Sequence, residues 1–100
     1  MLNFRTYKIA VEFYRQCQNL CLPTHLREQL NRASSSIALN LAEGYGRGSR
    51  KDQKRFFSIA FGSVRECQSI LDLATNIDPA LRQLLDTLAA HNYKLIKSMG

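Results

Sequence analysis

The chain has 100 residues, 45% of them hydrophobic, which is the size and composition of one globular domain spanning residues 1–100. Its 14 Lys and Arg residues outnumber its 8 Asp and Glu residues, and the net charge of +6 favours anionic partners. No apolar run approaches the roughly 18 residues that cross a bilayer, and the charged N-terminus is unlike a secretory signal. Three cysteines form no disulfide framework, so we expect a cytoplasmic protein without membrane contact.

The first half of the chain predicts two helices. Residues 3–20 form the first, because side chains recur there at helical spacing: Tyr7, Val11, Tyr14, Cys17 and Cys21. Pro23 separates it from the second, since a proline disfavours helix in the residue before it. Thr24 can cap the second helix, which runs to about residue 43. Gly44 suits its C-terminal cap, because glycine accepts a left-handed backbone without strain.

The second half of the chain predicts two more helices. Ser49 and Asp52 match a capping box at the start of the third helix. Its inward positions are expected to be Phe56, Ile59, Ala60, Ser63, Cys67, Ile70, Leu71 and Ala74. Asp78 and Pro79 fit the N-cap and first position of the fourth helix. No segment alternates as a strand would, and the connections are short. We therefore predict an all-α protein, an antiparallel up-down-up-down four-helix bundle.

Metal and catalytic sites receive little support from the sequence. A di-iron bundle needs Glu-x-x-His motifs on two helices, and the chain contains none. Cys17 and Cys21 can share a helix face, but two thiols do not complete a zinc site. The glycines at 44, 46 and 48 lack the Gly-Lys-Ser/Thr ending of a phosphate-binding loop. We expect no metal, no cofactor and no enzymatic activity, with Glu43 and Glu66 as the less favoured alternative of a catalytic pair.

Five polar residues are interspersed among the apolar positions of the second and third helices: Ser36, Asn40, Glu43, Ser63 and Glu66. Unpaired polar groups cost free energy when they are buried. We therefore predict that these side chains form a structural network beside the turn between the two helices. On this hypothesis, replacing Asn40 or Glu43 with alanine destabilises the fold by a few kcal/mol.

Five cations lie close together around the start of the third helix: Arg47, Arg50, Lys51, Lys54 and Arg55. Cations at this end oppose the helix dipole, at a cost of roughly 0.3–1 kcal/mol each. A phosphate would offset that repulsion and would also find free backbone amides. Tyr45 could stack on a base. We interpret the five cations as candidate nucleic-acid contacts, with a solvated basic turn as the alternative. Repeating them around an oligomeric ring would strengthen the local potential.

Residues 36–66 carry an ordered set of motifs. They read Ser36-Ile37, Asn40-Leu41-Ala42-Glu43-Gly44-Tyr45-Gly46-Arg47, Phe56, Ile59-Ala60-Phe61-Gly62-Ser63 and Glu66. In order and spacing this set resembles the four-helix-bundle family encoded in 23S ribosomal RNA intervening sequences. That family is similar to the accessory variability determinant of diversity-generating retroelements. The chain departs from the usual pattern in two ways, a shorter connection between the first two helices and a leucine for isoleucine at Leu41, which is a mild core change.

The resemblance implies an antiparallel four-helix bundle that assembles as a homopentamer, often with a basic face. For the retroelement relatives it also implies binding to nucleic acid and to a reverse transcriptase. We therefore expect a non-enzymatic oligomeric accessory protein that binds RNA or DNA and assists a reverse transcriptase or a process associated with ribosomal RNA. The alternative hypothesis is a homo-oligomeric protein-interaction scaffold that makes no direct contact with nucleic acid.

Overall fold

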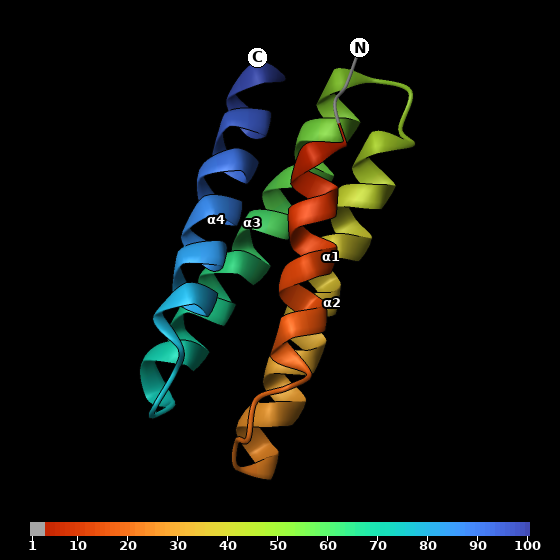
Figure 1. Ribbon diagram of the computed structural model, residues 1–100. Helices are drawn as coiled ribbons and strands as arrows, with labels where there is room; N and C mark the ends of the chain where they lie inside the picture. Colours follow the sequence, from red (N-terminus) through yellow and green to blue (C-terminus); the bar gives the residue numbers. More distant parts are fainter. Residues whose placement is uncertain (1–3) are drawn as a thin grey trace.

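The computed structural model describes residues 4–100 and contains four helices. These are α1 (Arg5–Cys17), α2 (Thr24–Tyr45), α3 (Arg50–Leu73) and α4 (Pro79–Ser98). No strand occurs in residues 4–100, so the all-α prediction is confirmed. Helix α1 contacts α2 and α4, and α3 contacts α2 and α4. These contacts, and the course of the chain in Figure 1, are compatible with an antiparallel up-down-up-down arrangement.

The core lies along the axis between the four helices. Its completely buried large side chains include Phe13, Phe57, Leu30, Ile37, Leu41, Leu71, Leu85 and Leu88. Burying a side chain of this kind contributes about 1.5–3 kcal/mol relative to leaving it in water. Taken together with the smaller buried residues, the buried positions of each helix recur about every three or four residues, as in an amphipathic helix. No helix in residues 4–100 is long and apolar enough to cross a membrane.

The inward face of α3 differs from the prediction near its start. Phe57 is completely buried, whereas Phe56 is only half-buried and Ile59 is 43% exposed. The buried positions Phe57, Ala60 and Val64 form one continuous stripe at helical spacing, and Phe56 and Ile59 lie on the adjacent stripe. Phe56 was therefore the wrong aromatic residue to assign to the core.

Helix α1 shows a similar shift of its inward face. The buried residues are Thr6, Ala10, Phe13 and Cys17. The predicted positions Tyr7, Val11 and Tyr14 are half-buried, and Cys21 is exposed. Helix α1 also ends at Cys17 rather than near residue 20. The sequence pattern favours the stripe of Tyr7, Val11 and Tyr14, but tyrosine and valine can cover the edge of a core as readily as its centre.

The helix ends confirm the capping predictions for α3 and α4. The Ser49 hydroxyl accepts a hydrogen bond from the Asp52 backbone N–H at 3.1 Å, and Asp78 accepts one from the Ala80 N–H at 2.9 Å. Pro79 is the first residue of α4, as predicted. The prediction for Thr24 was wrong, because this residue begins α2 and the N-cap position belongs to Pro23, which provides no side-chain cap.

Gly44 does not cap α2. The helix continues to Tyr45, and Gly46 ends it with a right-handed backbone at φ −85°. Gly44 is buried inside the helix, where a Cβ atom would lie 2.5 Å from Cε1 of Phe57. Because no Cβ can fit at that distance, Gly44 permits the close approach of α2 and α3. The role of Gly44 is therefore in packing and not in a left-handed cap.

Candidate nucleic-acid interface

One end of the molecule carries most of the positive charge. Figure 1 shows the start of α1, the α2–α3 connection and the end of α4 at this same end. Dividing each helix at its midpoint places nine of the 14 Lys and Arg residues in this half, with only two of the 8 Asp and Glu residues. We call this half the basic end, and its cations are Arg5, Lys8, Arg47, Arg50, Lys51, Lys54, Arg55, Lys94 and Lys97. The net charge of the chain is therefore concentrated there.

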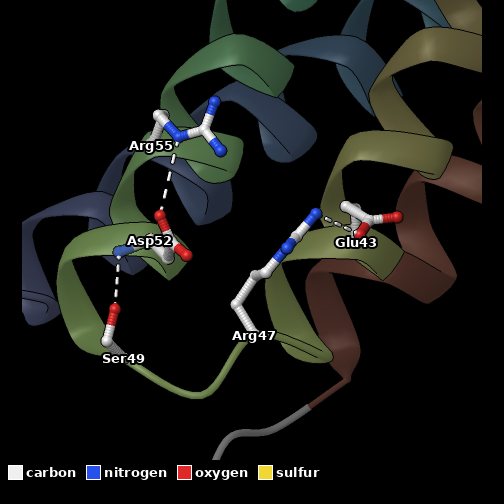
Figure 2. A network of polar contacts seen from close by, with 5 residues as sticks. All are labelled: Glu43, Arg47, Ser49, Asp52 and Arg55. Atoms are coloured by element: carbon white, nitrogen blue, oxygen red, sulfur yellow. Dashed lines mark hydrogen bonds and ion pairs between the residues drawn. The ribbon is translucent and has the colours of Figure 1, made fainter.

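Two of the five predicted contact residues pair with carboxylates, one in α2 and one in α3. The Arg47 guanidinium pairs with the Glu43 carboxylate at 2.7 Å, and Arg55 lies 3.7 Å from the Asp52 carboxylate. Figure 2 shows these two pairs on either side of the α2–α3 connection. Both guanidinium groups also lie over the Phe56 ring, at 4.6 and 4.5 Å from its centroid. Phe56 thus orients the two arginines at the surface instead of filling the core.

Arg50 connects α3 to α4. Its guanidinium donates a hydrogen bond to the backbone carbonyl of Ser98 at 3.0 Å, in the last turn of α4. A cation at a helix C-terminus is favourable because it compensates the partial negative charge of the last carbonyl groups. Arg50 therefore helps to hold the basic end together and still remains exposed.

Lys51 and Lys54 are exposed and, within residues 4–100, take part in no ion pair or hydrogen bond through their side chains. Both lie in the first turns of α3, where positive charge opposes the helix dipole. No carboxylate within residues 4–100 forms an ion pair with either lysine. Of the five predicted contact residues, these two lysines are the ones most available to an anionic ligand.

The structure joins three of the five residues of the predicted polar network. The Ser36 hydroxyl accepts hydrogen bonds from the Ser63 hydroxyl at 2.9 Å and from the Asn40 side-chain amide at 3.0 Å, and thereby links α2 to α3. The same amide donates to the Ser36 carbonyl at 2.9 Å. Glu43 is exposed and pairs with Arg47, and Glu66 is exposed and makes no bond to this group within the described residues.

Because Asn40 is only half-buried and Glu43 is exposed, replacing either residue with alanine should cost less than the few kcal/mol expected from the sequence. Asn40→Ala should lower the free energy of unfolding by about 1 kcal/mol, since it removes half-buried hydrogen bonds to Ser36. Glu43→Ala should cost less than about 1 kcal/mol, because its ion pair is exposed to solvent. Urea unfolding measures both values, and Ser35→Ala is the matched control, since that hydroxyl bonds only within its own helix. A loss above about 2 kcal/mol for Glu43→Ala would contradict this assignment.

An aromatic cluster at the basic end was not anticipated from the sequence. The ring of Tyr45 meets Phe4 edge-on at 4.8 Å and Phe57 at 5.3 Å between centroids. Burial raises the pKa of Tyr45, although a hydrogen bond with the Thr6 side chain acts in the opposite direction. Phe4 lies just before α1 and Tyr45 is the last residue of α2, so only the packing of these helices brings the two rings together. The signal available in the sequence was Tyr45 itself, placed between two glycines beside the cations.

The described residues offer no ready metal centre. No group of three or more His, Cys, Asp or Glu side chains lies close enough to hold an ion in residues 4–100. Cys17 and Cys67 are buried, and burial raises the pKa of the Cys17 thiol to about 12. A protonated thiol in the core is a poor metal ligand and a poor nucleophile.

The fold and the site together define a small all-α protein of four helices whose positive charge is concentrated at one end. The family model of the 23S rRNA-intervening sequence protein matches residues 3–99, and the chain belongs to this family. This match confirms the resemblance seen in residues 36–66 and extends it over nearly the whole sequence. No curated protein matches the chain.

Proposed function

We propose that this protein is a non-enzymatic, cytoplasmic accessory protein that binds RNA or DNA through phosphate contacts at its basic end. The observation that carries the proposal is the concentration of nine of the 14 basic residues in one half of the molecule. Such a field attracts a polyanion irrespective of its sequence and orients it toward the charged surface. On this proposal, Lys51 and Lys54 are the main phosphate contacts, and Arg47, Arg50 and Arg55 add to the field.

The proposal includes an antiparallel four-helix bundle that assembles as a homopentamer. Large apolar side chains that remain in water support self-association, since Leu39 is 69% exposed and Ile59 is 43% exposed. A ring would place five basic ends near one another and make binding multivalent. The assembly would then deliver nucleic acid to a reverse transcriptase or to a process associated with ribosomal RNA.

The protein-interaction scaffold is a second candidate function. The exposed side chains of Leu39 and Leu73, at 69% and 70%, favour contact with apolar partner surfaces. On this hypothesis the basic end only keeps the protein soluble and steers the approach of a charged partner. The absence of nucleic-acid binding at low salt, together with an oligomer of defined mass, would favour the scaffold.

Charge reversal at the two unpaired lysines tests the nucleic-acid proposal. The double variant Lys51→Glu/Lys54→Glu should bind single-stranded RNA and DNA at least about tenfold more weakly at low salt, and its salt slope should fall by about 1.4 for two lost phosphate contacts. Fluorescence anisotropy over a salt series measures both quantities. Glutamates in the first turns of α3 favour the helix dipole, so the variant should fold at least as stably as the natural protein.

The matched control is Arg27→Glu/Arg32→Glu, which makes the same change in net charge at the opposite end of α2. Both arginines are exposed, as are the two lysines. This control should keep most of the affinity and the full salt slope. An equal loss in both double variants would show that net charge alone matters, and would contradict a localised interface. Light scattering on the same samples establishes whether the oligomer is retained.

A further inference from the structure

A hollow opens at the basic end between the first turn of α1 and the last turn of α2. It is lined by Phe4, Tyr7, Ala42 and Tyr45 and has a volume of about 160 Å³. Three of its four lining residues are aromatic. Phe4 is 57% exposed, so the hollow is open to solvent on this side, and the Tyr45 ring also packs edge-on against Phe57.

The size and chemistry of the hollow suit one flat aromatic ring. An engineered protein cavity of about 150 Å³ binds benzene, so the available space matches a single ring. Exposed aromatic side chains cost free energy in water, and a stacked ring would recover part of it. The lining of the hollow is mostly apolar and contains no carboxylate, so it suits a flat ring better than a metal ion.

The surroundings of the hollow are positively charged. Arg5 and Lys8 follow Phe4 and Tyr7 on the same turns of α1, and Arg47 comes two residues after Tyr45. An occupant that combines a flat ring with negative charge therefore fits this place better than a neutral aromatic group. A nucleotide within a polynucleotide has both properties. Bases in a duplex are stacked on their neighbours, whereas a single strand can place a base on a protein ring.

We propose that this hollow holds one unstacked base of a single-stranded nucleic acid whose phosphates lie on the cations of the basic end. The inference rests on the proposed function and specifies its substrate class, single strands in preference to duplexes. Phe4 and Tyr7 form the open walls on which the base stacks, and Tyr45 forms the floor. Space for a single ring suits a pyrimidine, which presents one flat ring.

Two substitutions that leave every charge in place test the inference. Phe4→Ala removes an open wall, and Ala42→Leu fills the hollow with a residue that favours helix. Leu73→Ala is the control, since it removes an exposed apolar side chain from α3 near the opposite end. The probes are a thymidine single strand of about 12 nucleotides, the same strand with abasic sites throughout, and a duplex of the same length. Circular dichroism verifies that each variant folds.

The natural protein should bind the thymidine strand about tenfold more tightly than the abasic strand. Phe4→Ala and Ala42→Leu should each remove most of that difference, while the salt slope and the affinity for the abasic strand stay unchanged. Equal binding of the two strands by the natural protein, or unaltered binding by both variants, overturns the base-binding hollow and leaves the phosphate interface in place. Failure of all three probes to bind at low salt instead overturns the proposed function and the inference together.

Discussion

Replacing Gly44 with alanine is expected to lower the free energy of unfolding by about 2 kcal/mol or more. Alanine is the better helix former by about 1 kcal/mol, so helix propensity alone predicts the opposite sign. The added methyl group would lie 2.5 Å from Cε1 and 2.8 Å from Cδ1 of Phe57. Phe57 cannot easily move away, because it is completely buried and packs on Tyr45. Urea unfolding of the variant and the natural protein measures the difference.

Gly62→Ala is the matched control for this prediction. Gly62 also lies inside a helix, but a Cβ atom there meets nothing within 4 Å. The variant should therefore be more stable by about 0.5–1 kcal/mol. The double variant Gly44→Ala/Phe57→Leu should show a favourable coupling energy, because the smaller side chain makes room for the methyl group. A stabilising effect of Gly44→Ala would show that α2 and α3 can separate without cost, and would refute the packing role.

The helices and two of their caps could be predicted because their signals are local. Ser49 and Asp52 are three residues apart, and Asp78 and Pro79 are adjacent, so the chain itself brings the partners together. Which stripe of a helix faces inward depends instead on the other helices. Phe56 and Phe57 are equally apolar neighbours, and only packing against α2 and α4 decides that Phe57 is buried. For the same reason the sequence predicts a cap at Gly44, whose packing against Phe57 depends on a different helix.

The candidate site could be predicted only in part. The five cations are close together in sequence, and their surface position follows from their charge. Which of these cations have partners within the molecule does not follow from the sequence, because it depends on contacts such as that of Arg50 with Ser98 in α4. The aromatic hollow likewise joins the beginning of α1 to the end of α2, residues that are distant in sequence. The sequence therefore predicts where the cations gather, but not which of the five form ion pairs or hydrogen bonds within the molecule.

Raising the pH should unfold this protein more readily, because its core contains two thiols. Burial raises the pKa of Cys17 from an ordinary value of 9.0 to about 12. Burial also raises the pKa of Cys67, and the nearby Cys17 and Glu66 add to the effect. The folded state therefore favours the protonated thiols. The stabilisation is complete below the pKa of an unfolded cysteine and is lost as the pH rises from there toward the folded pKa values.

From about pH 7 to about pH 10 the free energy of unfolding should fall by about 1.4 kcal/mol for each buried thiol, or by about 3 kcal/mol for the pair. Urea unfolding at both pH values, with a reducing agent present, measures it. The variant Cys17→Ala/Cys67→Ala should begin less stable, because it leaves cavities, but should lose about 3 kcal/mol less over this range. In the Cys21→Ala variant, stability should fall with pH as much as in the natural protein, since Cys21 is exposed and both buried thiols remain. If the double variant and the natural protein lose stability in parallel, the thiols ionise without unfolding the core, and the packing around Cys17 and Cys67 is looser than the structure indicates.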